Sequence, residues 1–278
     1  MKSLYDVSAP AKLNLFLHVV GRRSDGYHLL ESVFRLIYWC DTLHFEIRTD
    51  GEISREDLNC TLPEQDLIVR AARSLQQFSG TPLGAHIGVH KSIPAQAGLG
   101  GGSSDAASTL LALNRLWRLG LDRSSLMAIG LQLGADVPFF LGCNNAFVSG
   151  IGENLHPILL PPAQYLVVKP QTGLDTGRIF SHPQLKRDSE TTIITGFAAN
   201  ADWSCRNDLQ EVARSLCPDI DEAIDWLRIQ GLSGRMTGSG SAVFAELKSA
   251  MVFDNVPGEY QVRVCDGLAA HPLLGWAA

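Results

Sequence analysis

A glycine-rich run stands directly before a strongly apolar segment. Residues 98–104 read Gly-Leu-Gly-Gly-Gly-Ser-Ser, and the apolar residues that follow recur at helical spacing up to residue 117. Glycine lets the backbone approach an anion because no Cβ intervenes, and a helix start exposes unpaired N–H groups at the positive end of the helix dipole. This pattern favours a polyphosphate site at the start of a helix.

The helix after this run is predicted to begin within residues 103–105, Ser-Ser-Asp, because all three are of types that cap helices. Its apolar face consists of Ala107, Leu110, Leu111 and Trp117. Two familiar nucleotide motifs do not fit. No lysine follows Gly102, as a Walker loop requires, and Ser103 stands where a dinucleotide fingerprint needs its third glycine. A flexible turn before a core helix is the alternative, but the density of glycine and serine exceeds what a turn needs.

A second candidate for chemistry is Asp136, an isolated carboxylate in the apolar segment 133–142. A charge among apolar neighbours is either buried for a purpose or exposed at a turn. Pro138 follows two residues later and aspartate is a common turn residue, so a turn that caps the chain break at Gly134 is the alternative. The pattern by itself leaves both interpretations open.

A third candidate is the polar face of an alternating segment. Residues 7–19 place alanine, leucine and valine on one side and Lys12 and Asn14 on the other, which predicts a strand with one apolar face. Such polar positions most often face solvent. Lys12 and Asn14 are therefore candidates for a site only if the strand is covered on both sides.

The segment after this strand combines a turn with two ring-bearing side chains. Ser24-Asp25-Gly26 is a strong turn signal, and Tyr27 and His28 begin an extended segment. Tyr27 offers either a surface aromatic or a flat face for a ring ligand, and His28 offers a hydrogen bond or an ordinary polar contact. The pattern does not choose between them.

The elements that must position these residues mix helix and strand. Amphipathic helices are predicted over 66–78, over 124–134 (begun by Ser124 or Ser125 and ended at Gly134) and over 219–231. Strands are predicted over 85–93, 165–170 and 259–264, with a strand-turn-strand unit over 234–247. Residues 150–162 end in Pro-Pro and are the predicted domain junction, which gives domains 1–157 and 158–278.

Composition excludes several classes of function. The chain of 278 residues has room for one large or two ordinary domains, and its 45% hydrophobic and 19% charged residues are typical of a globular protein. A net charge of -6 without a basic stripe argues against nucleic acid as a partner. No apolar run is long enough to span a membrane and no signal-peptide core is visible, so we expect a cytoplasmic protein without a membrane partner.

Cysteine is expected to be structural. No C-x-x-C pair occurs, no histidine stands at zinc-ligand spacing, and no activating neighbour is obvious. The six cysteines, predicted to be reduced, are Cys40, Cys60, Cys143, Cys205, Cys217 and Cys265.

Five segments together carry a family resemblance. PAKLNLFL (10–17), DGYH (25–28), PAQAGLGGGSSDAA (94–107), LGADVPFF (133–140) and MTGSGSAVF (236–244) resemble the successive signature segments of the GHMP kinases, in the family's order. The resemblance extends from about Ala9 to Phe244. It implies an α+β, two-domain GHMP kinase fold, with an N-terminal ATP-binding domain like domain 2 of ribosomal protein S5 and a ferredoxin-like C-terminal domain on the substrate side.

The resemblance also implies a reaction and its participants. ATP, with Mg²⁺, donates a phosphoryl group to a small-molecule acceptor that carries a cytidine diphosphate group. Asp136 is implied as the catalytic base, and Lys12 as the cation that keeps it ionised and stabilises nearby charge. The Ser104 hydroxyl is the expected contact to Mg²⁺. Asp105 departs from some relatives, which carry asparagine, and adds a negative charge that must cap the helix or point away.

The binding residues follow from the same resemblance. Those implied for the ATP phosphates are Pro94, Gly98, Leu99, Gly100, Gly101, Gly102, Ser103 and Ser104, with Gly238, Ser239 and Gly240 from a second glycine loop over 237–241. The acceptor's cytosine is expected between Tyr27 and Phe180, with His28 at its polar edge, Asn14 at the sugar-like end and Thr176 in the covering segment. The alternatives are a homoserine or mevalonate type of GHMP kinase and a nucleotide-binding module without catalysis.

Overall fold

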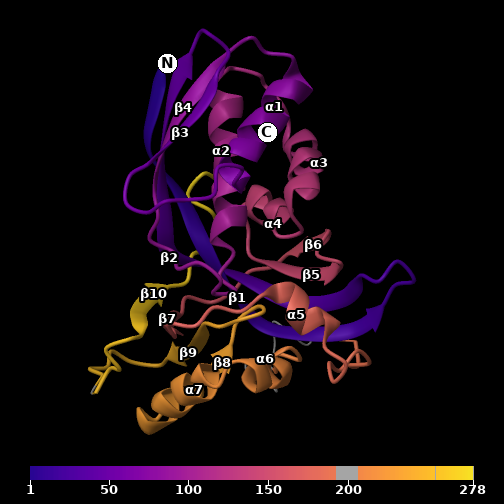
Figure 1. Cartoon of the computed structure of the whole chain (residues 1–278), viewed down its shortest axis with the longest axis vertical. Helices are drawn as coiled ribbons and strands as arrows, with labels where there is room; N and C mark the ends of the chain where they lie inside the picture. Colours follow the sequence, from indigo (N-terminus) through magenta and orange to yellow (C-terminus); the bar gives the residue numbers. More distant parts are fainter. Residues whose placement is uncertain (192–205, 254, 278) are drawn as a thin grey trace.

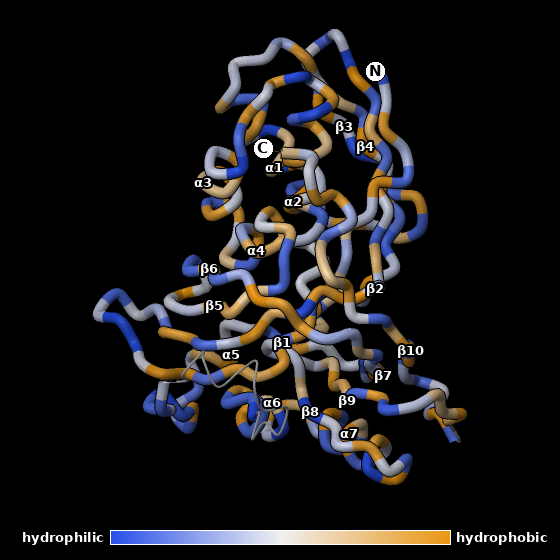
Figure 2. Tube along the Cα trace, turned by 180° about the vertical axis from the view of Figure 1, so that it is seen from behind, coloured by the Kyte–Doolittle hydropathy of each residue, from blue (hydrophilic) through white to orange (hydrophobic). Residues whose placement is uncertain are grey.

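One long hairpin organises the protein (Figure 1). The computed structural model describes residues 1–191, 206–253 and 255–277, so Cys205 lies outside the described residues. Strand β1 (Ser3–Arg22) runs antiparallel to β2 (His28–Arg48) along almost its whole length, with several register shifts. Figure 2 shows the hydrophilic tip of this hairpin, residues 22–26, projecting from the body of the molecule.

The first sheet holds this hairpin and four more strands. These are β3 (Ile53–Asp57), β4 (Gly84–His90), β5 (Ala146–Gly150) and β6 (Asn154–Pro157), in the order β3-β4-β2-β5-β6 with β1 against β2. Its helices are α1 (Leu67–Ser79), α2 (Gly101–Leu116), α3 (Arg123–Leu133) and α4 (Val137–Gly142). They gather beside the sheet, and the largest apolar core lies between helices and strands (Figure 1).

The second sheet confirms the α+β prediction. Its strands are β7 (Gln164–Lys169), β8 (Arg235–Met236), β9 (Val243–Leu247) and β10 (Gln261–Asp266), all antiparallel, in the order β10-β7-β9-β8. Its helices are α5 (Thr176–Ser181), α6 (Gln210–Leu216) and α7 (Asp219–Ile229). Numbered along the chain, the strands lie 4-1-3-2, which is the ferredoxin-like order, although the described residues between β9 and β10 form no helix.

Strand β1 is buried on both faces, which changes the meaning of its polar residues. Leu17 and Val19 belong to the core of the second sheet, whereas Val7 and Ala9 belong to that of the first. Burial on both sides leaves Lys12 only 3% and Asn14 only 2% exposed. The interpretation of these two residues as a solvated face is therefore wrong.

The remaining predicted elements are confirmed with small shifts. Helix α1 begins after Asp66, whose side chain accepts the Val69 N–H, and the strand-turn-strand unit over 234–247 forms β8 and β9. Helix α3 is capped by Asp122, which accepts the Ser125 N–H, so the cap lies two residues before Ser124 and three before Ser125, the predicted caps. Aspartate is at least as good a cap as serine, and it precedes them.

The described cysteines fit a structural role. Cys40, Cys60, Cys143, Cys217 and Cys265 are all free thiols. Burial raises the pKa of Cys40 to about 11 and that of Cys265 to about 12. Thiols with such pKa values are almost entirely protonated at neutral pH and are poor nucleophiles.

The end of the chain returns to the first sheet. Leu273 and Ala277 pack in its core, and the backbone N–H of His271 donates to the carbonyl of Cys143. The division into domains 1–157 and 158–278 stays a prediction, and residues 268–277 contact the first of the two units. None of the helices in the described part of the chain has the length and apolar character needed to cross a membrane.

His271 gives this returning segment a pH dependence. It is 1% exposed, its Nδ1 accepts the Leu273 N–H, and burial, with Arg123 nearby, lowers its pKa to about 4. The unfolded chain takes up a proton near pH 6.5, whereas the folded chain resists it down to about pH 4. Stability contributed by the neutral ring is therefore present above pH 6.5 and is lost as the pH falls toward 4.

We expect His271→Asn to weaken this pH dependence, because asparagine keeps an acceptor for the Leu273 N–H and does not titrate. Linkage predicts that, between pH 7 and pH 5, the free energy of unfolding falls by about 2 kcal/mol more in the original protein than in the variant. Urea unfolding of both proteins at the two pH values measures it. Equal losses would show that His271 is not the titrating group.

Candidate active site

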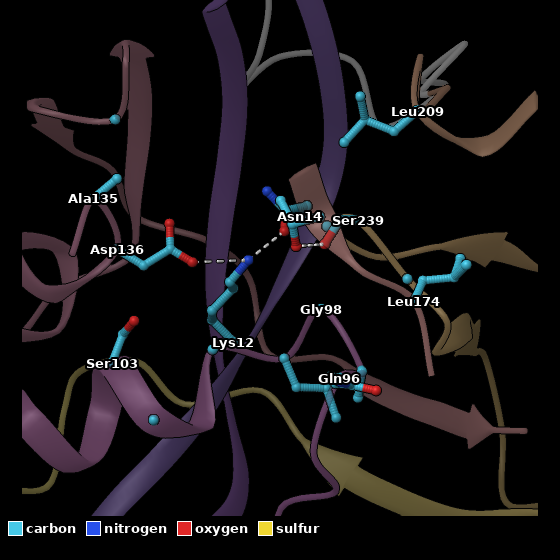
Figure 3. Close-up of a pocket in the computed structure, with 18 of the residues that line it drawn as sticks. Lys12, Asn14, Gln96, Gly98, Ser103, Ala135, Asp136, Leu174, Leu209 and Ser239 are labelled. Atoms are coloured by element: carbon cyan, nitrogen blue, oxygen red, sulfur yellow. Dashed lines mark hydrogen bonds and ion pairs between the residues drawn. The ribbon is translucent and has the colours of Figure 1, made fainter. Parts of the chain in front are cut away.

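A cavity of about 1210 Å³ opens where the hairpin, the glycine run and the second sheet meet (Figure 3). It brings together segments from both ends of the chain. Every candidate site residue predicted from the sequence lines it except Ser104. The lining residues form three groups: a phosphate loop with its partner loop, a Lys12–Asp136 centre, and an aromatic wall at the hairpin.

The glycine run does lead directly into a helix, but the predicted serine cap is wrong. Helix α2 begins at Gly101, and its cap is Gly100, which takes the left-handed conformation with φ 74° and no side-chain cap. A Cβ at Gly100 would lie 3.0 Å from the Phe140 ring and 3.2 Å from Lys12 Cε. Because no side chain caps the helix, the first-turn N–H groups remain available for an anion.

The two glycine loops pack backbone against backbone. Gly98 has φ 71°, and a Cβ there would overlap the carbonyl oxygen of Thr237. A Cβ on Gly238 would in turn lie 2.8 Å from the carbonyl oxygen of Gly98. The N–H of Ser241 donates to the Gln96 carbonyl over 3.2 Å. The second loop therefore supports the first, so segments from the two halves of the chain together form the predicted phosphate region.

Lys12 and Asp136 form the centre of the cavity (Figure 3). Lys12 Nζ lies 3.4 Å from Asp136 Oδ2 and donates to Asn14 Oδ1 over 2.6 Å. The lysine side chain is 4% exposed and the aspartate 32%, so the ammonium is enclosed while the carboxylate reaches open space. A partly accessible carboxylate beside a buried cation is suited to accept a proton from a bound hydroxyl.

Local backbone geometry explains where Asp136 points. It occupies the cap position of α4, and the side chain makes no capping hydrogen bond. Val137 and Pro138, which follow, are buried in the core. The turn interpretation is therefore right for the backbone and wrong for the carboxylate, which faces Lys12 instead (Figure 3).

Asn14 ties this centre to both sheets. Its Nδ2 donates to Ser32 Oγ over 2.9 Å, and its backbone N–H donates to Thr237 Oγ1 over 2.8 Å. With its Oδ1 accepting from Lys12, the side chain is anchored at both ends. This arrangement positions the Lys12 ammonium, a role that the sequence pattern did not suggest for Asn14.

The two serines after the glycines have different surroundings. Ser104 is fully buried, its hydroxyl has no hydrogen-bond partner among the residues that the structure describes, and it does not line the cavity. Ser103 does line the cavity and projects from the start of α2 on the side of Asp136 (Figure 3). The Ser104 hydroxyl does not face the cavity as expected of a Mg²⁺ contact, because the helix begins at Gly101 and turns Ser104 toward the core.

The negative charge of Asp105 is compensated by Lys91, a residue that the sequence pattern did not single out. Lys91 Nζ donates to the buried carboxylates of both Asp105 and Asp41. Burial raises the pKa of Asp105, the Lys91 charge opposes the rise, and Asp41 adds to it. Asp105 thus neither caps the helix nor points to solvent. Lys91 lines the cavity beside it and compensates its charge.

The aromatic wall lies near the tip of the hairpin, where β2 begins. His28 and Phe180 have ring centroids 5.1 Å apart, and Tyr27, 61% exposed, stands next to His28 in the chain. Thr176 Oγ1 shares a hydrogen bond of 2.7 Å with Ser239 Oγ, which links α5 to the second glycine loop. The structure therefore brings these predicted acceptor residues to the same cavity as Lys12 and Asp136.

Comparison with known proteins agrees with this geometry. Two family models match the chain. The one described as GHMP kinases N terminal domain matches residues 66–143, and the one described as GHMP kinases C terminal matches residues 192–257. Together they span the glycine run, Asp136 and the second glycine loop. The chain belongs to the GHMP kinases and is an ATP-dependent phosphotransferase.

Individual members of the family are similar to this chain to different degrees. A protein of Albidiferax ferrireducens named 4-diphosphocytidyl-2-C-methyl-D-erythritol kinase is 66% identical over all of this chain and 96% of its own. A crystal structure of 4-(cytidine 5'-diphospho)-2C-methyl-D-erythritol kinase matches with TM-score 0.77 and 32% identity, covering 95% of this chain and 99% of that one. A homoserine kinase from Cytophaga hutchinsonii, at TM-score 0.71 and 14% identity over 98% and 96%, shares the fold.

Proposed function

We propose that this protein transfers the γ-phosphoryl group of ATP to the 2-hydroxyl of 4-(cytidine 5'-diphospho)-2-C-methyl-D-erythritol, a step of the non-mevalonate route to isoprenoid precursors. The observation that carries the proposal is a single cavity that holds the Lys12–Asp136 centre and an aromatic wall. The names of the similar proteins agree with it.

The residues of the centre account for the chemical step. The acceptor oxygen attacks the γ-phosphorus, the bond to the β-phosphate oxygen breaks, and ADP leaves. Asp136 receives the proton of the attacking hydroxyl. The Lys12 ammonium, fixed by Asn14, lies 3.4 Å from the Asp136 carboxylate and stabilises negative charge on the attacking oxygen. Positioning and charge neutralisation provide most of the catalysis in such reactions.

The phosphate groups would lie against the two glycine loops. The uncapped start of α2 supplies backbone N–H groups, and the second loop holds the first in place. Mg²⁺ keeps several waters and is held mainly by substrate phosphates with one or two protein oxygens. The Ser103 hydroxyl, which lines the cavity at the helix start, is the oxygen we assign to it. When bound, Mg²⁺ neutralises phosphate charge.

The aromatic wall distinguishes the proposal from its alternatives. A small acyclic acceptor such as homoserine or mevalonate has no ring to place against Phe180 and Tyr27. A binding module without catalysis has no need of a base 3.4 Å from a buried lysine. Both features are present here, and together they favour an acceptor with a planar base that is phosphorylated.

The purified protein with Mg²⁺ and ATP tests the proposal directly. It is offered the cytidine diphosphate acceptor, homoserine or mevalonate, with ADP release measured and the product identified by ³¹P NMR. We expect turnover with the first acceptor only. Comparable kcat/KM with homoserine or mevalonate would contradict the proposal. ATP binding without turnover on any acceptor would favour the binding module.

Phe180→Ala tests the aromatic wall. Loss of one base-stacking partner is expected to weaken acceptor binding by about 1–3 kcal/mol and to leave the affinity for ATP unchanged. Calorimetric titration with each ligand measures both. A matched control is Phe253→Ala, because Phe253 packs partly buried against the same core but does not line the cavity. The control should lower the melting temperature without changing acceptor affinity. Parallel loss of both affinities in Phe180→Ala would rule out stacking.

A further inference from the structure

Arg187 reaches from the segment after α5 to the start of β2. Its Nε–H donates to Nε2 of His28 over 3.0 Å, across 159 positions of the chain. Its terminal nitrogens donate to three carbonyls of its own segment, those of Phe180, His182 and Leu185, over 3.2, 2.9 and 2.9 Å. No sequence motif singled out this arginine.

The guanidinium therefore acts as a rigid link between two residues of the aromatic wall, His28 and Phe180. It is planar, and four of its five N–H groups are used in this contact set. Nη2 donates to the carbonyl of Phe180 and Nε–H donates to the ring of His28, and the rings of these two residues lie 5.1 Å apart. A flexible side chain with a single donor could not fix both.

The contact also decides where the His28 ring carries its proton. Arginine has donors and no acceptor, so Nε2 must accept, and a neutral ring then bears hydrogen on Nδ1. Burial first, then the charges of Arg187 and Arg22, lower the pKa of His28. These two arginines are the charged groups that face the ring from β1 and from the segment after α5. Protonation of the ring would set a third positive charge among them.

We propose that Arg187 is a positioning residue for the acceptor, which holds His28 in the tautomer with hydrogen on Nδ1 and so presents a donor to the cytosine edge. That edge offers hydrogen-bond acceptors at N3 and O2. In the described part of the chain, Nδ1 of His28 has no hydrogen-bond partner, so this donor is free for a ligand. The identity of the ligand rests on the proposed function, but the tautomer does not.

The first test uses the ligand-free protein labelled with ¹⁵N-histidine. Nitrogen chemical shifts report which ring nitrogen carries hydrogen, and His28→Gln identifies the His28 signals among those of the eight histidines. We expect hydrogen on Nδ1 in the original protein at neutral pH. In Arg187→Met the signals should move toward the Nε2–H tautomer that free imidazole side chains favour, and the ring should protonate at higher pH. Hydrogen on Nε2 in the original protein overturns the proposal whether or not the variant folds.

The second test separates positioning from mere support of the fold. Arg187→Met is expected to raise the KM for the acceptor about 5- to 10-fold, the usual worth of one hydrogen bond, with little change in kcat or in the KM for ATP. In a His28→Ala background, most of that effect should vanish, because the arginine acts through the histidine. Arg178→Met, an exposed arginine of α5, is the matched control and should change neither constant.

Additive effects of the two substitutions would overturn the proposal, as would an unchanged His28 tautomer in Arg187→Met. Failure of the original protein to phosphorylate a cytidine diphosphate acceptor would defeat the proposed function instead. The NMR result would still decide the link between Arg187 and His28, since it needs no acceptor. The two failures are therefore distinguishable.

Discussion

Replacing Asp136 with asparagine is expected to reduce kcat about 10²–10⁴-fold while the fold and the affinity for ATP are kept. The amide has the shape of the carboxylate but no basic oxygen to receive the acceptor's proton. Asp136 sits at the cap position of α4 without a capping hydrogen bond, so the change removes no support from the helix. The measurements are steady-state kinetics with the acceptor, ATP titration and thermal unfolding.

The matched control is Asp122→Asn. Asp122 caps α3 through its side chain, asparagine caps equally well, and the residue does not line the cavity. We expect this variant to keep full activity and stability. If Asp136→Asn retained a kcat close to that of the original protein with saturable substrates, a different group would have to accept the proton.

The elements of this fold were largely predictable because local signals agree with one another. Segment 66–78 has an apolar stripe with Asp66 in front of it, and it forms α1 where the stripe requires. The passage from the glycine run into α2 was predictable for the same reason, since glycines, serines and a periodic apolar segment follow one another directly in the chain. The residue at which the helix begins was not predictable. The cap lies at Gly100, where a Cβ would come within 3.0 Å of Phe140 and 3.2 Å of Lys12, and no local pattern shows these contacts.

What could not be predicted depends on contacts between distant segments. Alternation correctly gives the strand around Lys12, but its burial arises because the second sheet covers the other face of β1. The cluster of Lys91 with Asp41 and Asp105 joins three segments, and each residue alone resembles an ordinary surface charge. Only the family resemblance paired Lys12 with Asp136, because the residues themselves carry no signal of their 3.4 Å separation.

The second large effect is expected for Lys12→Met. Methionine fills a similar buried volume but removes the ammonium that lies 3.4 Å from Asp136 and donates to Asn14. Loss of one preorganised charge at a reacting oxygen typically lowers kcat about 10²–10³-fold. Because Lys12 lies on β1 beside the base rather than within the glycine loop, the affinity for ATP should change little. A loss confined to ATP affinity would reassign Lys12 to nucleotide binding.

Lys169→Met provides a comparison for the general cost of removing a buried ammonium. Lys169 is 5% exposed, donates to the carbonyls of Pro170 and Thr172, and does not line the cavity. The Lys169→Met substitution should lower the stability of the protein without a comparable loss of kcat.

The double variant Lys12→Met/Asp136→Asn then separates the two roles of Lys12. If the lysine acts only by keeping Asp136 ionised, the double variant should be no slower than Asp136→Asn alone, because no carboxylate remains to be maintained. If it also stabilises charge on the attacking oxygen, a further loss of kcat should appear. We expect the further loss, since the ammonium is anchored by Asn14 independently of Asp136. Equal rates for the double variant and for Asp136→Asn would limit Lys12 to the first role.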